Sequence, residues 1–143
     1  MSVSTFAATA STTSAAAGSM VLRVANLSAQ YGKVNAVVGA NIAVAAGSIV
    51  TVIGGNGAGK STLLNSIMGS LPISGHSAGS VQYLGTEVGG WQVERRVSRG
   101  MSLVPERREL FGSMTVEDNL LLGGFRLYRA GKSGWKDTIN EVY

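Results

Sequence analysis

One short segment constrains the fold of this chain more than any other. The residues Gly54-Gly55-Asn56-Gly57-Ala58-Gly59-Lys60-Ser61 follow the pattern G-x-x-x-x-G-K-S/T. Residues 49–53, directly before it, are apolar at nearly every position, which predicts a strand buried on both faces of a helix-covered parallel sheet. After it, apolar residues recur at helical spacing over 61–68, and Gly69 marks the end of the predicted helix. This order of strand, glycine-rich loop and helix predicts an α/β fold with a phosphate-binding loop.

The residue types of the loop suit an anionic ligand. Glycines let successive backbone N–H groups turn toward one anion, and a helix that begins near Lys60 adds its dipole and its unpaired N–H groups. Lys60 would bring a positive charge to the β and γ phosphates of a nucleotide, and the Ser61 hydroxyl would ligate Mg²⁺. A glycine-rich turn that binds nothing is disfavoured by the flanking strand and helix patterns. The candidate binding residues are Gly54, Gly55, Asn56, Gly57, Ala58, Gly59, Lys60, Ser61 and Thr62.

The distribution of charge agrees with this prediction. The 143 residues include 12 Lys and Arg against 8 Asp and Glu, a net charge of +4. Before Glu87 the charged residues are Arg23, Lys33 and Lys60, so no carboxylate near the loop in sequence would repel a nucleotide. The chain has no cysteine and one histidine, His76, which excludes disulfides, thiolate chemistry and histidine-cluster metal sites.

The chain divides into a tail and one domain. Residues 1–19 are almost entirely Ser, Thr and Ala without charge, and we expect a disordered tail there, with Met20 as a second candidate start of translation. Residues 20–143 form the expected domain. The uncharged stretch 34–59 is long enough to cross a membrane, but its glycines, asparagines and short β-branched clusters favour strands and turns.

Other elements follow from local patterns. A capping box, Thr115-Val116-Glu117-Asp118, predicts a helix that begins near Thr115. The pattern fades after Gly123-Gly124. Strands are predicted at 21–27 and 37–44, an edge strand at 80–84, a short basic helix at 93–99, and a third apolar strand at 101–104 that Pro105 ends.

Hydrolysis by a P-loop enzyme also needs an Asp at the end of a second apolar strand and a residue that activates water. Residues 101–106 come nearest to such a strand, but Pro105 and the lack of a second carboxylate beside Glu106 make this segment a poor candidate. The sequence therefore predicts nucleotide binding more firmly than it predicts catalysis.

The segments that carry these motifs resemble the ATP-binding subunits of ABC transporters, most closely those of branched-chain amino acid importers. The resemblance covers about residues 21–125 and rests on Tyr31-Gly32, on 54–62 and on 100–108. Phe111 and the stretch 114–120 narrow it to the amino acid subgroup.

The resemblance implies a P-loop NTPase-like mixed sheet with helices, a small antiparallel β subdomain, and ATP and Mg²⁺ as cofactors. It implies that Tyr31 stacks on adenine, where spacing alone favours an ordinary half-buried strand tyrosine. Glu106 takes the place of a glutamine that touches Mg²⁺ or the attacking water, and the alternative is a solvated loop carboxylate. Lys60 and Glu106 are thus the candidate catalytic residues, and Ser61 and Glu106 the candidate metal ligands.

This sequence also departs from the pattern of that family. Its members continue with a Leu-Ser-Gly-Gly-Gln type signature, a second apolar strand ending in Asp and Glu, and a switch histidine, none of which occurs here. This chain resembles roughly the first half of such a subunit, so we expect that alone it does not turn over ATP. The implied partners are membrane permease subunits and a second ATP-binding subunit at the cytoplasmic face of the cell membrane. Membrane association would be peripheral, and no nucleic acid partner is expected.

Three hypotheses remain open. The chain is the ATPase subunit of an importer in incomplete form, a nucleotide-binding module without catalysis, or a truncated gene product that does not fold stably and has no activity. Another P-loop enzyme, such as a small kinase or GTPase, is the least favoured hypothesis. Such an enzyme needs a second carboxylate for Mg²⁺ and a motif that recognises the base, and this sequence shows neither.

Overall fold

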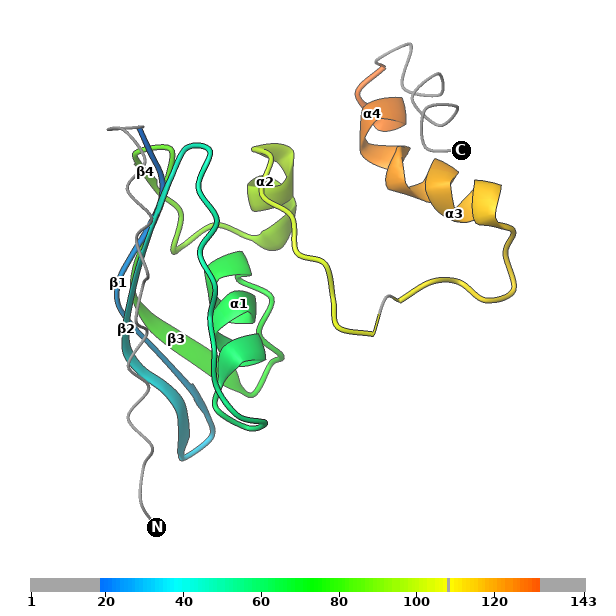
Figure 1. The fold of residues 1–143 in the computed structure, drawn as a ribbon. Coiled ribbons are helices and arrows are strands. Elements are labelled where there is room, and N and C mark those ends of the chain that lie inside the picture. The colour runs from blue at the N-terminus through cyan, green and yellow to red at the C-terminus, as the bar shows by residue number, and fades with distance from the viewer. Residues whose placement is uncertain (1–18, 108, 132–143) are drawn as a thin grey trace. The chain divides into compact units, whose positions relative to one another are not determined.

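The computed structural model describes residues 19–107 and 109–131. The described residues fall into two units, one ending at Leu103 and the other beginning at Val104 (Figure 1). The prediction of a disordered tail at 1–19 lies, except for Ser19, outside the described residues.

The first unit contains one four-stranded sheet. Its strands are β1 (Met20–Tyr31), β2 (Val34–Ala45), β3 (Gly75–Tyr83) and β4 (Thr86–Glu87), in the order β2-β1-β3-β4 with every neighbouring pair antiparallel. The strands predicted at 21–27 and 37–44 are confirmed and are longer than expected. The strand predicted at 80–84 forms as part of β3, but its edge position is wrong, because β3 lies between β1 and β4.

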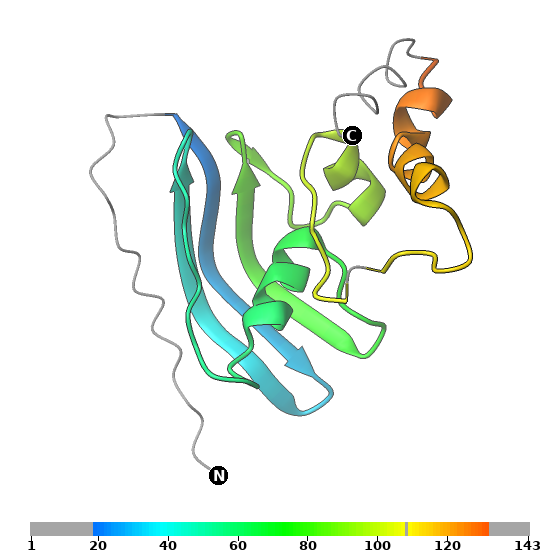
Figure 2. The same cartoon turned by 45° about the vertical axis from the view of Figure 1, so that its right-hand side comes forward.

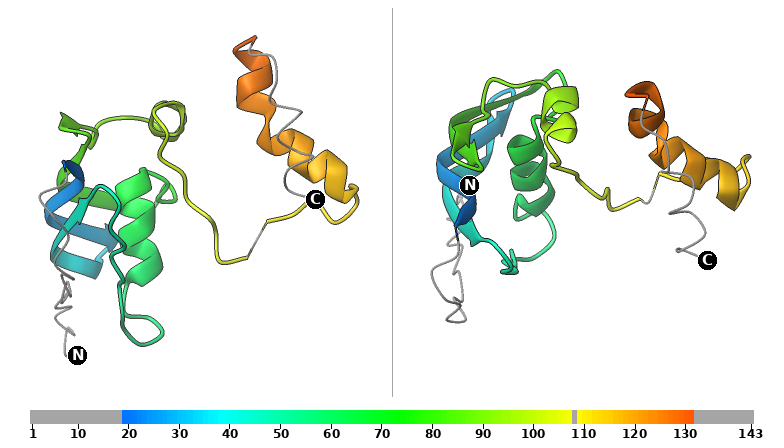
Figure 3. Two further views of the ribbon diagram at one scale, coloured as in Figure 1. Left: turned by 45° about the horizontal axis from the view of Figure 1, so that its top comes forward. Right: turned by 90° about the horizontal axis from the view of Figure 1, so that it is seen from above.

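Two helices accompany this sheet. α1 (Lys60–Met68) lies against one face of the sheet, and α2 (Val93–Ser98) follows β4 in the chain (Figures 2 and 3). Both confirm the predicted helices. The core forms where α1 meets the sheet, because the apolar side of α1 and the inward residues of the long strands cover each other. Its buried apolar residues are Val24, Leu27, Ala29, Val37, Ala40, Leu63, Ile67, Met68, Val81, Val88 and Met101.

The predicted buried strand at residues 49–53 is wrong. Within the described residues this segment belongs to no sheet, and Ile49 and Ile53 are 92% and 83% exposed. Val52 alone in this segment packs against the core. Residues 101–104 also form no strand, although Met101 is buried. A buried parallel strand needs hydrogen-bonded neighbours, and neither apolar run has one in the described part of the chain. The observed sheet therefore corresponds to the small antiparallel β subdomain of the prediction, and the strands of the predicted mixed sheet do not pair among the described residues.

The second unit carries α3 (Val116–Gly123) and α4 (Phe125–Arg129). The predicted capping box is confirmed: Thr115 Oγ1 accepts from the Asp118 N–H at 3.1 Å, and Asp118 Oδ2 accepts from the Thr115 N–H at 3.3 Å. α4 was not predicted. No described residue of this unit is buried. Across the described parts of both units, none of the helices has the length and apolar character needed to cross a membrane.

Candidate functional site

The glycine-rich loop leads directly into α1. Gly59 is the N-cap residue, no side chain caps the helix, and its first turn carries no acidic residue. The first helical bond runs from the Leu63 N–H to the Gly59 carbonyl at 2.8 Å. Because the first four N–H groups of a helix have no partner within it, those of residues 59–62 can face an anion. The exposed residues 54–57 leave this end of α1 open to solvent. The arrangement suits a phosphate group.

Two glycines of the loop are required by its backbone. Gly57 and Gly59 have φ angles of +81° and +88°, the left-handed region that disfavours side chains. A Cβ on Gly59 would also lie 2.3 Å from the Ala36 carbonyl oxygen and 3.2 Å from Val37 Cγ2, so this residue packs closely on β2. A Cβ on Gly55 would meet nothing within 4 Å. The last glycine of the motif is therefore needed for its backbone conformation and for its packing on β2.

Lys60 lies over the loop that it follows. Its Nζ donates to the carbonyl oxygens of Gly54 and Gly55, both at 2.7 Å. These partners are neutral, so the ammonium charge is not cancelled by a carboxylate. Ser61, the candidate Mg²⁺ ligand, is exposed on the first turn of α1. The structure thus brings the predicted phosphate-binding residues together at one end of α1.

Tyr31 also lies at this end of α1. It is the last residue of β1, and its hydroxyl donates to Thr62 Oγ1 at 3.4 Å. Glu106 is exposed and belongs to the second unit, and its roles as a catalytic residue and Mg²⁺ ligand stay predictions.

Sequence reasoning missed Arg96, which holds the opposite end of α1. This side chain is 2% exposed, and its guanidinium donates to three backbone carbonyls: Trp91 at 3.1 Å, Gly89 at 2.9 Å, and Ile67 in the last turn of α1. Burial lowers the pKa of Arg96, and the charge of Glu87 offsets part of this effect. A cation is favourable at a helix C-terminus, so Arg96 fixes α1 from the end away from the loop.

One sequence signal could have revealed that Arg96 is buried, although not which carbonyls it meets. Arg96 is three residues after Val93 and directly before Val97, and both valines pack against the core. A helix position on the same side as core residues is buried, and a buried arginine needs partners for its N–H groups.

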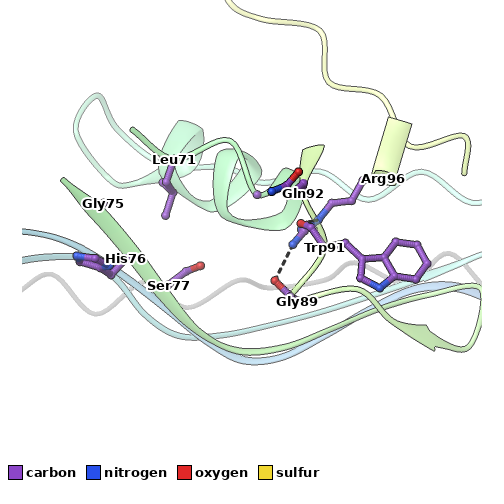
Figure 4. A pocket seen from close by; sticks show the side chains of 10 residues that line it. Leu71, Gly75, His76, Ser77, Gly89, Trp91, Gln92 and Arg96 are labelled. Carbon is purple, nitrogen blue, oxygen red and sulfur yellow. Dashed lines mark hydrogen bonds between the residues drawn. The ribbon is translucent and has the colours of Figure 1, made fainter. Parts of the chain in front are cut away.

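An open pocket of about 350 Å³ lies beside Arg96 (Figure 4). Leu71, His76 and Trp91 are among its lining residues, and the figure shows the Arg96 guanidinium bonded to the Gly89 carbonyl. No residue of the loop 54–59 lines it. The candidate phosphate site is therefore an exposed helix end and not this pocket.

Comparison with known proteins settles the family. The profile of the family described as ABC transporter matches residues 37–142. The chain belongs to the ABC transporter family. This confirms the resemblance that the motifs indicated, including its P-loop NTPase fold.

The relatives of this ABC transporter chain include two branched-chain amino acid transport proteins. It is 41% identical over 117 residues to the high-affinity branched-chain amino acid transport ATP-binding protein BraG of Pseudomonas aeruginosa. The matched region is 82% of this chain and 49% of BraG. It is 33% identical over 122 residues to the probable branched-chain amino acid transport ATP-binding protein LivF of Archaeoglobus fulgidus, covering 85% and 49%.

A sugar importer protein is also similar. The galactose/methyl galactoside import ATP-binding protein MglA of Treponema denticola is 32% identical over 106 residues, which is 74% of this chain and 21% of that protein. The chain thus spans about half the length of the two branched-chain relatives and about a fifth of the length of the sugar importer protein.

Proposed function

We propose that this chain supplies the phosphate-loop half of the ATP-binding subunit of an ABC importer for branched-chain amino acids. The observation that carries the proposal is the uncapped N-terminus of α1 behind the open loop 54–59, with the Lys60 ammonium lying on that loop. The names of the relatives BraG and LivF, both branched-chain amino acid transport ATP-binding proteins, support branched-chain amino acids as the transported class. The proposed partners are permease subunits and a second ATP-binding subunit, at the cytoplasmic face of the membrane.

Each residue of the site would have a distinct role in binding Mg-ATP. The Lys60 ammonium would leave the Gly54 and Gly55 carbonyls and contact the β and γ phosphates, while the backbone N–H groups at the start of α1 hold the remaining phosphate oxygens. Ser61 would ligate Mg²⁺ through its hydroxyl. Tyr31 would stack on adenine, a contact worth ~1–3 kcal/mol per base in nucleic-acid complexes. Mg²⁺ would neutralise phosphate charge when bound.

Hydrolysis belongs to the complete subunit in this proposal. Glu106 would orient water or touch Mg²⁺ there, and the signature and the second carboxylate strand would come from outside these 143 residues. A second candidate, a nucleotide-binding module without catalysis, is favoured by the lack of a Leu-Ser-Gly-Gly-Gln type segment in the 143 residues. Both candidates predict nucleotide binding without turnover by this chain alone.

Calorimetry with millimolar Mg-ATP on the full chain tests the binding. Lys60→Ala removes a full charge from the phosphates, and we expect binding to weaken roughly 10–100-fold. Lys33→Ala is the matched control, because Lys33 is an exposed lysine in the turn between β1 and β2. Absence of binding heat on a sample proven folded would contradict the proposal. Steady-state turnover that is lost in Lys60→Ala would contradict the expected lack of hydrolysis.

The transported class is tested in cells. Deletion of the gene should abolish uptake of radiolabelled leucine, isoleucine and valine while galactose uptake continues. Loss of galactose uptake with normal leucine uptake would show that the assignment to amino acids is wrong.

A further inference from the structure

We propose that Tyr31 positions the phosphate-binding end of α1 through its hydroxyl, in addition to offering a ring to the base, and that Gly75 provides the space its ring needs. This inference rests on the proposed function, because it assumes that the start of α1 binds phosphate. It assigns a second role to Tyr31 and a first role to Gly75.

The backbone of Tyr31 is fixed from both sides. In the sheet it pairs with Val34 of β2 on one side and with Gly75 of β3 on the other. The next residue, Gly32, donates its N–H to the Ser74 carbonyl at 3.2 Å. Because strand pairing on both sides fixes the backbone of Tyr31, its side chain can hold the start of α1 in a defined position.

The hydroxyl of Tyr31 reaches the first turn of α1. It donates to Thr62 Oγ1 at 3.4 Å, in a partly buried contact between residues 31 positions apart. The N–H of Thr62 is among the four that a helix leaves without an internal partner at its start. The contact therefore links the sheet to the same turn whose N–H groups would hold phosphate. Gly59, packed on Ala36, is a further close contact between this end of α1 and the sheet.

Gly75 is needed here for space and not for its backbone conformation. Its φ does not lie in the left-handed region, so an alanine could adopt this backbone without strain. A Cβ at this position would lie 3.0 Å from Tyr31 Cε1 and 3.1 Å from Leu71 Cβ. Any side chain at position 75 would push the ring of Tyr31 and, with it, the hydroxyl that meets Thr62.

A phosphate ligand without a base separates the two roles of Tyr31. Tripolyphosphate has no ring to stack, so a tyrosine that only stacks on adenine would leave its binding unchanged. A tyrosine that positions Thr62 would affect tripolyphosphate and ATP alike. The 3.4 Å distance is long for an O–H···O hydrogen bond, so we expect an effect of about threefold, at the lower end for such bonds.

The experiment is calorimetry of Mg-tripolyphosphate and Mg-ATP binding to the full chain and to Tyr31→Phe, which keeps the ring and removes the hydroxyl. We expect both ligands to bind about threefold more weakly. Tyr83→Phe is the matched control, since Tyr83 is a partly buried tyrosine at the opposite end of β3, and it should bind both ligands as the unaltered chain does. Unchanged tripolyphosphate binding in Tyr31→Phe would overturn the inference.

Gly75→Ala provides a second test with the same ligands. It should weaken tripolyphosphate binding in the unaltered chain and have no further effect in Tyr31→Phe, because the hydroxyl contact is already lost there. An equal effect of Gly75→Ala in both backgrounds would show that Gly75 does not act through the Tyr31 hydroxyl, and would overturn this part of the inference.

Failure of the proposed function gives a different result. If the unaltered chain binds neither ligand, the phosphate site itself is wrong, and the contact is then measured without ligand. A cycle of Tyr31→Phe and Thr62→Val in urea unfolding should show about a threefold coupling in the unfolding equilibrium constant. Additive effects would overturn the positioning role of Tyr31, and coupling would support the contact even without a nucleotide.

Discussion

Replacing three glycines of the loop by alanine, one at a time, separates the reasons why glycine stands at each position. Gly55 has neither a left-handed φ nor a neighbour within 4 Å of an added Cβ. Gly57 has a φ of +81° and no such neighbour, so alanine would be strained but not crowded. Gly59 combines a φ of +88° with a Cβ position 2.3 Å from the Ala36 carbonyl oxygen and 3.2 Å from Val37 Cγ2. Gly55→Ala therefore tests neither effect, Gly57→Ala tests backbone strain alone, and Gly59→Ala tests strain together with close contact.

The expected free energies of unfolding follow in order. Gly55→Ala should be neutral or stabilising by up to about 1 kcal/mol, because alanine restricts the unfolded chain. Gly57→Ala should cost about 1–2 kcal/mol from backbone strain. Gly59→Ala should cost the same strain plus a displacement of α1 from β2, and we expect at least about 2 kcal/mol more than Gly57→Ala.

Urea unfolding followed by circular dichroism measures these differences, and calorimetry with Mg-ATP measures the binding of each folded variant. If Gly59→Ala were no less stable than Gly57→Ala, the close packing of the loop on β2 would be wrong. If Gly57→Ala unfolded like Gly55→Ala, the left-handed backbone at position 57 would be wrong. In either case the account of the loop geometry would have to change.

Three further predictions concern residues outside the loop. Arg96→Met should lower the free energy of unfolding by roughly 3 kcal/mol, because three backbone carbonyls lose a buried hydrogen-bond donor. Arg95→Met is the control: the Arg95 guanidinium lies over the Trp91 ring at an exposed position, and its loss should cost less than about 1 kcal/mol. Equal losses in urea unfolding would contradict this prediction. Thr115→Ala should lower the free energy of opening of α3, measured by amide hydrogen exchange, by about 1 kcal/mol, and unchanged exchange rates would contradict the capping role. The hydroxyl bond from Ser80, more than the backbone N–H bonds, lowers the pKa of Glu87. The carboxylate therefore stabilises the fold above its unfolded pKa, and this contribution is lost as the pH falls through the lower folded pKa. Glu87→Gln should reduce the acid dependence of stability, and an identical acid profile would refute this.

Features specified by neighbouring residues could be predicted from the sequence. α1 follows from its preceding glycine loop and its helical spacing, and α3 from a capping box whose two partners are three residues apart. The bonds of Lys60 to the loop carbonyls were not predicted, although they span only five and six residues. For α1 and α3 the interactions that fix the geometry lie within about two helical turns, so the local sequence pattern contains them.

Features that depend on residues far apart in the chain could not be predicted from the sequence. The contact of Arg96 with the Ile67 carbonyl joins residues 29 positions apart, and the bond from Tyr31 to Thr62 joins residues 31 apart. The apolar run 49–53 shows the opposite error, because strand propensity describes a pleated and half-buried surface that only a neighbouring strand provides. Without such a neighbour among the described residues, Ile49 and Ile53 stay exposed.

The two ends of the phosphate loop are therefore held unequally. At its helix end, Gly59 packs on β2 and Thr62 meets Tyr31, so a ligand finds this part of the cradle already ordered. At its other end, residues 49–53 have no ladder bonds within the described residues, and fixing a backbone residue costs about 1–2 kcal/mol. Part of the interaction energy with a triphosphate would be offset by ordering this segment. We therefore expect weak nucleotide binding by this chain, on the order of millimolar, even with every motif residue present.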